Sequence, residues 1–366
     1  TWRKIGKKGE KIEYKWNKTY SKKKIKINNF FKNDFIKSTL NEKKIALKDN
    51  KGLASRKSSE SIISSLVKKS NTLIGGSADL AGSNNTKTKY HKIITPKNYN
   101  GNYIHYGVRE HAMCGIMNGL ALHSKFIPYG GTFLIFSDYC KPSIRLAAIM
   151  KQRVIYVMSH DSIGLGEDGP THQPIEQLTG LRSIPNLNVF RPADTAETFE
   201  CWDLATISIK DQPSIIAVSR QKVNPIRKEF TKENKCSAGA YEVSRTKSEI
   251  DVTILATGSE VELAIEVSQK LAIEKIYSKV ISMPCHELFD MQKKDYKSKI
   301  LNETKHKISI EASTTDYWKK YIGENGIAFG IDNFGKSAPY KEIYEHFGLT
   351  SKNIVKKVKE MINNKT

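Results

Sequence analysis

Short apolar segments alternate with amphipathic ones over residues 53–220. The apolar segments are rich in β-branched side chains, as buried strands are. With the turns that close them they lie at residues 72–80, 103–108, 126–133, 153–158, 186–192 and 213–220. Apolar positions spaced three or four apart predict helices between them, at residues 54–66, 111–123, 133–149, 175–181 and 195–208. For the first of these helices, Ser58 or Ser59 is a candidate N-cap. Strands that alternate with helices predict a parallel sheet.

A second unit of the same kind follows. It has apolar segments at 251–256, 280–283 and 307–310, a helix that begins near residue 260, and a closing helix at 353–361. We therefore predict the α/β fold class, with two domains that each hold a mostly parallel sheet flanked by helices, at residues 51–222 and 239–366. The segment 223–238 is rich in Lys and Asn and predicts a linker. Residues 1–50 are polar and weakly patterned, which predicts a linker or arm that lies on something larger.

Composition narrows the function classes. The net charge is +22, but only ten of the 60 basic residues are Arg and the Lys residues are spread along the chain, so we expect no nucleic-acid partner. No apolar run is long enough to span a bilayer, and the Lys-rich start has no apolar segment typical of a secretory signal, so we expect no membrane association. The five Cys are scattered without CxxC spacing, which favours reduced thiols in a cytoplasmic protein over a zinc site. A start without Met suggests that the chain begins inside a longer protein.

Polar side chains follow the predicted strands at their carboxyl ends, where open α/β sheets bind ligands. The densest stretch is the loop His160–Pro174, with two His and three acids. The candidates that we expect to meet at this edge are Asp79, Glu110, His160, Asp168, His172 and Arg220. Glu110, at a strand-to-helix junction, fits a ligand-facing carboxylate and a helix-dipole acid equally well. Phe133, Phe136 and Tyr139 recur every three residues, which by itself favours a core stripe.

Two of the few Arg residues, Arg56 and Arg220, suit bidentate recognition of phosphate. Together with the His and Asp residues they suit a phosphorylated polyol. The sequence has no Walker loop, no HExxH and no GxSxG, so it offers no motif of an NTPase, a zinc protease or an α/β-hydrolase.

Several segments resemble transketolase, in that family's order and spacing. They are Gly75–Leu80, Tyr106–His111, Tyr129–Phe133, His160–Pro174, Arg191–Asp194 and Ser219–Gln221, and the resemblance covers residues 52–366. It implies transfer of a two-carbon ketol unit from a ketose phosphate to an aldose phosphate, with thiamine diphosphate and Mg²⁺, in a homodimer whose active site forms between subunits.

The resemblance also implies residue roles. Glu110 matches the acid that hydrogen-bonds N1′ of the cofactor's aminopyrimidine and acts in acid–base catalysis, while Phe133, Phe136 and Tyr139 match the pocket around that ring. Asp79 matches an acid near the cofactor. The residues that match binding of the sugar phosphate are Arg56, Ser83, His160, Asp168, His172 and Arg220, and Asp168 among them would hold a hydroxyl.

One departure from the family is large, because its amino-terminal diphosphate-binding domain and Gly-Asp-Gly metal motif have no counterpart here. We expect no metal ligand in this chain, little activity from it alone, and cofactor and Mg²⁺ held mainly by the missing domain; Glu167-Asp168-Gly169 is not that motif. A dihydroxyacetone synthase-like transferase and a non-catalytic, transketolase-like interaction module remain alternatives. Deoxyxylulose-phosphate synthase fits the His160–Pro174 loop less well.

Overall fold

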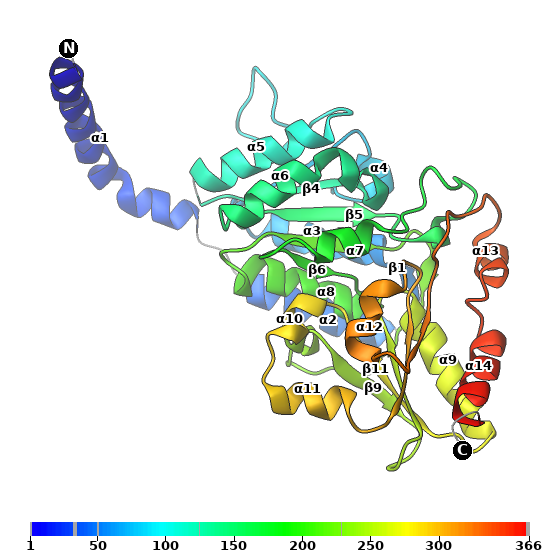
Figure 1. Cartoon of the computed structure of the whole chain (residues 1–366). Helices are drawn as coiled ribbons and strands as arrows, with labels where there is room; N and C mark the ends of the chain where they lie inside the picture. The colour runs from blue at the N-terminus through cyan, green and yellow to red at the C-terminus, as the bar shows by residue number, and fades with distance from the viewer. Residues whose placement is uncertain (1, 32–34, 50, 124, 228, 364–366) are drawn as a thin grey trace.

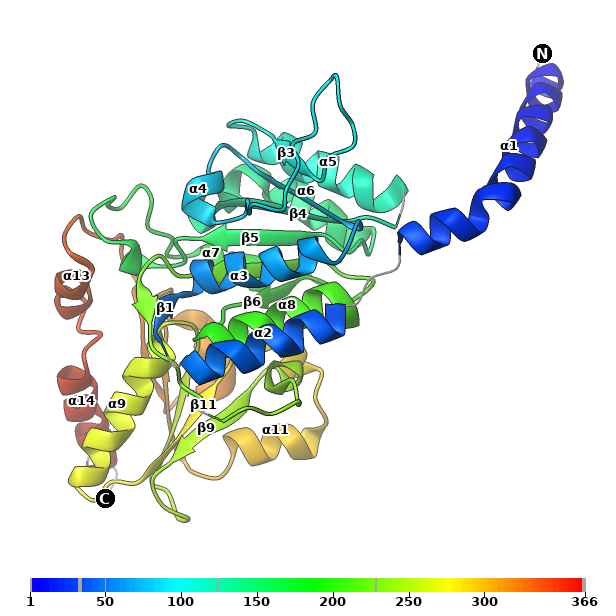
Figure 2. The same cartoon turned by 180° about the vertical axis from the view of Figure 1, so that it is seen from behind.

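The computed structural model describes residues 2–31, 35–49, 51–123, 125–227 and 229–363, and it has the α/β architecture that the pattern predicts. Two sheets lie in one body, each with helices on both faces (Figure 1). A long helix projects from that body at the amino-terminal end (Figures 1 and 2).

The first sheet has six strands, all parallel, in the order β3-β2-β4-β5-β7-β6. Their bounds are β2 (Leu73–Ser77), β3 (Tyr103–His105), β4 (Ile127–Phe133), β5 (Ile155–Ser159), β6 (Asn188–Phe190) and β7 (Ser214–Val218). Side chains of its central strands β5 and β7 contribute to an apolar cluster on each face of the sheet, and β4 contributes to one of the two. One cluster includes residues of α5 (Glu110–His123), α6 (Ser137–Ile149) and α7 (Gln177–Arg182). The other includes residues of α2 (Phe35–Asp49), α3 (Ser55–Lys68) and α8 (Thr195–Asp203).

The second sheet has the order β13-β12-β10-β11-β9, and only its edge strand β9 runs antiparallel. The strands are β9 (Tyr241–Arg245), β10 (Val252–Ala256), β11 (Ser278–Ser282), β12 (His306–Ile310) and β13 (Ile327–Phe329). Helices α9 (Glu260–Ile273), α13 (Tyr340–His346) and α14 (Ser351–Asn363) contribute to the apolar cluster on one face. On the other face are α10 (His286–Asp290), α11 (Lys294–Leu301) and α12 (Lys319–Ile322). The remaining elements are the short helix α4 (Ala81–Asn84) and the antiparallel pair β1 (Leu53–Ala54) and β8 (Lys222–Val223).

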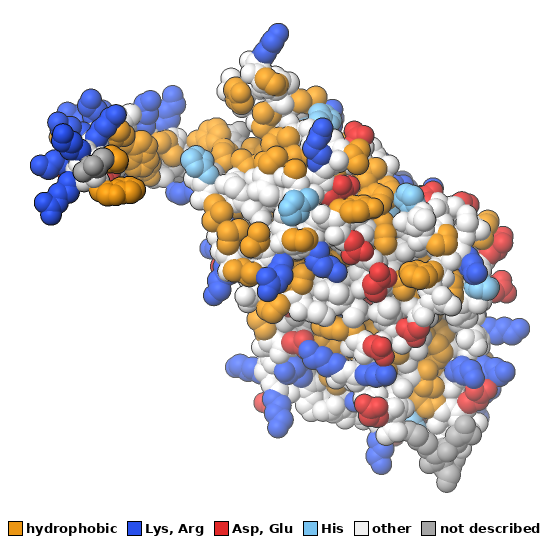
Figure 3. Space-filling view, turned by 45° about the horizontal axis from the view of Figure 1, so that its top comes forward, with side chains coloured by type: hydrophobic (Ala, Val, Ile, Leu, Met, Phe, Trp, Pro, Cys, Tyr) orange, Lys and Arg blue, Asp and Glu red, His pale blue; other side chains and the backbone are white. Residues whose placement is uncertain are grey.

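The amino-terminal arm is helical, which its weak pattern did not predict. Helix α1 (Trp2–Phe30) has no buried residue, and Figure 3 shows basic side chains gathered on it with hydrophobic ones among them. Helix α2 instead packs on the first domain, with Phe35 buried beside Trp202 in one apolar cluster. Since Lys and Asn fill 21 of the 50 positions of this segment, its apolar spacing was too weak to predict either helix.

Two local predictions were wrong. Ser58 and Ser59 do not cap α3, which begins at Ser55. Their hydroxyls make tertiary contacts, with Thr195 Oγ1 at 2.8 Å and with the indole N–H of Trp202 at 2.9 Å. The aromatic residues 133, 136 and 139 do not share one helix either: the first ends β4, the second closes a 3₁₀ turn and the third lies in α6.

Candidate active site

The carboxyl edge of the first sheet collects most of the candidate residues. Asp79 follows β2, Glu110 begins α5 just after β3, Phe133 ends β4, His160 follows β5 and Arg220 follows β7. All these strands are parallel, so their carboxyl ends meet at one edge. The apolar runs predicted this position at the sheet edge, because each group lies at the end of such a run or within a few residues after it.

Four rings form a stack at this edge. His160 lies on Phe133, with 3.7 Å between ring centroids and 27° between planes, and Phe133 stacks on Phe136 at 5.6 Å and 8°. Tyr139 continues the stack at 5.8 Å, and His172 meets Phe136 edge-on at 5.7 Å. Only one end of the stack is open: Tyr139 is 65% exposed and Phe136 is half-buried, whereas Phe133 and His160 are buried. An open aromatic surface of this kind can bind a flat heterocycle.

A chain of hydrogen bonds orients the imidazole of His160. The hydroxyl of Ser159 donates to Asn84 Oδ1 at 2.7 Å and lies 2.9 Å from Nδ1 of His160. With the hydroxyl proton committed to Asn84, Nδ1 is the donor toward Ser159, which leaves the lone pair on Nε2. His160 is therefore prepared to accept a hydrogen bond from a ligand hydroxyl.

The surroundings of His160 are cationic. Burial lowers its pKa to about 3, and the nearby charges of Arg56, Arg220 and His172 act in the same direction. Burial and Arg220 also lower the pKa of Arg56. Backbone carbonyls hold both guanidinium groups: Arg56 donates to Ser83 O at 2.8 Å and Arg220 to Leu165 O at 2.9 Å. Two cations held this close favour an anion between them, as a phosphate would be.

Glu110 is a buried carboxylate, 8% exposed, at the first position of α5. The Thr132 hydroxyl donates to its Oε1 at 3.4 Å, and Thr132 directly precedes Phe133 of the aromatic stack. The carboxylate is therefore held at the carboxyl end of β4, the strand that Phe133 ends. It also carries the negative charge that the helix amino terminus favours, so both interpretations of Glu110 fit its position.

Three candidates have fewer side-chain contacts with the rest of the candidate site: Ser83, Asp79 and Asp168. Ser83 takes part through its backbone carbonyl rather than its hydroxyl. Asp79 and Asp168 are both exposed, and in the described ranges no hydrogen bond or ion pair joins either of them to the other candidates. Asp79 has a φ of +62° and His160 a φ of +61°, a conformation that costs a non-glycine residue about 1 kcal/mol or more.

Sequence reasoning missed a buried charge cluster behind the loop that begins at His160. Arg191 bonds Asp161 Oδ2 at 2.9 Å and also contacts Glu260 and Glu311. Arg182 forms a bidentate ion pair with Glu311, with hydrogen bonds of 2.8 and 2.9 Å. Arg191 stands in a quoted motif, but its partners lie up to 120 residues away along the chain, so spacing gave no signal.

Other possible sites hold none of these residues. Over the described part of the chain, no group of three His, Cys, Asp or Glu side chains is arranged to bind a metal ion, and no helix is long and apolar enough to cross a bilayer. The five Cys are free and buried.

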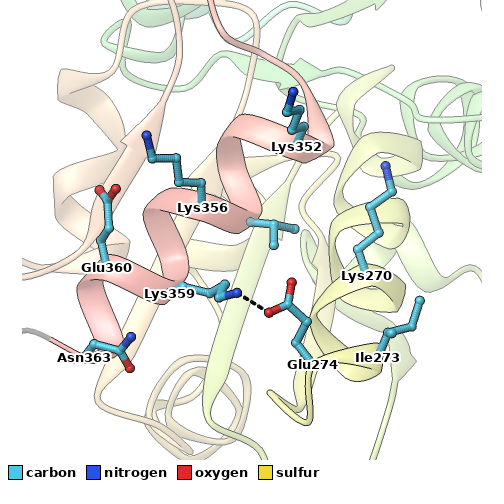
Figure 4. Close-up of a pocket in the computed structure, with 9 residues that line it drawn as sticks. Lys270, Ile273, Glu274, Lys352, Lys356, Lys359, Glu360 and Asn363 are labelled. Carbon is cyan, nitrogen blue, oxygen red and sulfur yellow. Dashed lines mark hydrogen bonds and ion pairs between the residues drawn. The ribbon is translucent and has the colours of Figure 1, made fainter.

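A cavity of about 770 Å³ lies between α9 and α14, with Lys352, Lys356 and Lys359 along one wall (Figure 4). Lys359 there is paired with Glu274 of the opposite helix.

Comparisons with known families match both domains. Residues 51–225 match the transketolase pyrimidine-binding domain, and residues 239–350 match the transketolase-like C-terminal domain. The chain is 50% identical to the transketolase of Sinorhizobium medicae over 290 residues, which are 79% of this chain and 41% of that protein. It is 42% identical to the transketolase of Aquifex aeolicus over 362 residues, 96% of this chain and 52% of that protein. The chain thus spans about half the length of these curated relatives.

Solved structures give the same result. Transketolase from Campylobacter jejuni superposes with a TM-score of 0.85 at 37% identity, over 96% of this chain and 53% of that one. Transketolase from Pichia stipitis in complex with sedoheptulose 7-phosphate superposes with a TM-score of 0.84 at 34% identity, over 97% and 53%. The similarity therefore extends through both domains of this chain and the segment before them.

Proposed function

Because the chain belongs to the transketolase family, we propose that it supplies the pyrimidine-binding and C-terminal domains of a ketol transferase. The enzyme would move a two-carbon unit from a ketose phosphate, xylulose 5-phosphate or sedoheptulose 7-phosphate, to an aldose phosphate, ribose 5-phosphate or glyceraldehyde 3-phosphate. This is a step of the pentose phosphate pathway in the cytoplasm. The observation that carries the proposal is the aromatic stack beside buried Glu110, on the same edge as the paired Arg56 and Arg220.

The residues present fit the pyrimidine part of thiamine diphosphate. Phe136 and Tyr139 offer partly open rings that continue the stack from buried Phe133, and Glu110 offers a buried carboxylate that can hydrogen-bond a ring nitrogen. Bound thiamine diphosphate supplies the electron sink for breaking and forming the carbon–carbon bond. Glu110 would exchange a proton with the aminopyrimidine, and Asp79 lies on the same edge. Mg²⁺ and the diphosphate need further ligands, since the described residues contain no metal cluster.

The substrate would lie on the cationic side of the edge. We assign Arg56 and Arg220 to the phosphate, with His172 and Ser83 beside it. His160 would accept a hydrogen bond from a substrate hydroxyl through Nε2, and Asp168 would hold another hydroxyl. Arg56 and Arg220 repel one another until an anion lies between them, so phosphate binding removes an unfavourable interaction that is already present.

An exposed apolar surface supports a subunit interface next to this edge. Six large hydrophobic residues of α5, α6 and the segment just before α5 are between 48% and 76% exposed: Val108, Ile116, Leu122, Tyr139, Leu146 and Ile149. Helices α5 and α6 pack on one another, and exposed apolar side chains gathered on such a pair are typical of an interaction site. Because Tyr139 belongs both to it and to the aromatic stack, we propose that a homodimer closes the site from this side.

The test is ketol transfer from xylulose 5-phosphate to ribose 5-phosphate with thiamine diphosphate and Mg²⁺. The chain would be joined behind the amino-terminal half of the Aquifex aeolicus transketolase, next to the same protein with Glu110→Gln. We expect activity in the first and a loss of 100-fold or more, on the order of general acid–base contributions, in the second. Equal activity in both would refute the role of Glu110. No activity in a folded, dimeric hybrid would favour the non-catalytic module. Faster transfer to formaldehyde than to ribose 5-phosphate would favour the dihydroxyacetone synthase-like alternative.

A further inference from the structure

The loop between β5 and α7, residues 160–176, is built into the second domain. Ile163 and Ile175 of this loop belong to the apolar cluster of the second sheet, together with Val261 of α9 and Ile343 of α13. Both loop residues are almost completely buried, at 0% and 5% exposure. The second domain therefore supplies the apolar surroundings that fix the path of this loop.

Polar contacts fix the middle of the loop to the segment before α13. The side-chain amide of Gln173 donates to Gly166 O at 3.0 Å and to Lys336 O at 2.8 Å, so one group closes the loop and joins it to the second domain. The hydroxyl of Ser337 donates to Glu167 O at 2.5 Å. Gln173 is buried, and Gly335 lies against it so closely that a Cβ there would be 1.6 Å from Oε1.

A charge cluster fixes the start of the loop. Asp161, the residue after His160, is bonded to Arg191. Arg191 also contacts Glu260 at the start of α9 and Glu311 just after β12. All four side chains are buried. A buried guanidinium with carboxylates on both domains resists separation, because separation would leave a charge without its partner.

The same loop carries the groups that we assign to the sugar phosphate. His160 begins it, Arg220 is held by the carbonyl of Leu165 within it, and His172 directly precedes Gln173. We propose that the C-terminal domain positions the sugar-phosphate subsite, with Gln173 and Gly335 as the principal positioning residues. This inference rests on the proposed function, since it concerns the same subsite.

Gly335→Ala tests the inference from the second domain, on a residue that touches no predicted substrate group. The new methyl would displace Gln173 and so release the loop. The matched control is Gly326→Ala in the same domain, where the methyl meets Ile322 at 2.6 Å instead of the loop. Near-ultraviolet circular dichroism would verify that each variant is folded.

Two measurements on the 366-residue chain give the readout. The first is the affinity for ribose 5-phosphate, from NMR shifts of the His ring protons. We expect Gly335→Ala to weaken it tenfold or more and Gly326→Ala to change it less than twofold. The second is the titration of His160, which faces Arg56, Arg220 and His172. Its signal should stay flat between pH 5 and 8 in the parent and the control, and should titrate within that range in Gly335→Ala.

Gln173→Ala is a second test of the same inference. It remains usable if Gly335→Ala does not fold. It removes two hydrogen bonds and adds no volume, and it should shift both readouts in the same direction. The double variant should be no worse than Gln173→Ala alone, because the displaced group is already gone. Folded Gly335→Ala and Gln173→Ala proteins with parental affinity and a flat His160 signal would overturn the inference. If the parent does not bind ribose 5-phosphate, the phosphate assignment fails, and the His160 titration alone decides the positioning role.

Discussion

His160 shows how much one residue can depend on others. Its ring lies on Phe133, its Nδ1 meets Ser159 and its backbone has a φ of +61°, so stacking, hydrogen bonding and backbone conformation must all be satisfied together. Strained conformations of this kind persist only where the surroundings determine them fully. At a binding site the conformational strain is offset, because a pre-oriented imidazole loses little conformational entropy when a ligand binds.

A second imidazole allows a prediction of pH dependence. The backbone N–H of Thr88 donates to Nδ1 of His91 at 2.8 Å, and the hydroxyl of Tyr129 lies 2.6 Å from Nε2. Burial lowers the pKa of His91 to about 4, below its ordinary value of 6.5. Between these values the unfolded chain binds a proton that the folded chain does not. The stabilisation is therefore complete above pH 6.5 and is lost as the pH falls toward 4.

The measurement is urea unfolding between pH 4 and 7. His91→Gln should flatten the pH dependence of the free energy of unfolding, by up to about 1.4 kcal/mol per pH unit for one proton. The control His123→Gln changes an exposed imidazole and should leave the slope unchanged. A His91→Gln slope equal to the parent's would contradict the prediction.

At the scale of the element, apolar patterning located the strands well and the amino-terminal helices poorly. Central strands buried on both faces are short segments with few polar side chains and no charged ones, so β4, β5 and β7 stand out. Helices α1 and α2 are rich in Lys and Asn and show no apolar spacing strong enough to predict them. Apolar patterning also predicted which polar residues lie at the sheet edge, and their roles stay predictions. It did not predict the contacts of Gln173 and Arg191, because the partners of these residues are distant in sequence.

The packing of α2 gives a prediction at this scale. Phe35 is 2% exposed against the helices of the first domain, whereas its neighbour Ile36 is 56% exposed. Phe35→Ala should lower the free energy of unfolding by about 3 kcal/mol, the usual cost of truncating a buried aromatic residue. Ile36→Ala should change it by less than about 0.5 kcal/mol. The measurement is urea unfolding at pH 7, and equal effects of the two substitutions would show that α2 does not pack as described.

At the scale of the whole molecule, the two domains share a core. Ile163 and Ile175 come from the first domain and lie in the apolar cluster of the second, and Arg191 bonds carboxylates of both. The domain boundaries at 222 and 239 remain predictions drawn from composition. The polar composition of residues 223–238 indicates where the chain passes from the first sheet to the second. It gives no sign that the apolar core of the second domain includes residues of the first.

A continuous interior predicts joint unfolding. Calorimetry of the chain should show one transition, with equal calorimetric and van't Hoff enthalpies, because neither domain can unfold without exposing apolar surface of the other. Arg191→Met would leave buried carboxylates without their cation and should lower the transition by several degrees without splitting it. Two separate transitions in the parent would contradict the shared core.

The shared apolar core also determines where this chain can be recombined with a related one. A recombination point within 223–238 looks harmless because the segment is polar, but it would pair the loop of one parent with the core of another, and Ile163 and Ile175 would then meet foreign partners. A crossover ahead of α2 leaves both that interior and the packing of Phe35 intact. The two domains should therefore be exchanged together when chimaeras are made. We expect few chimaeras that exchange only the second domain to fold and function.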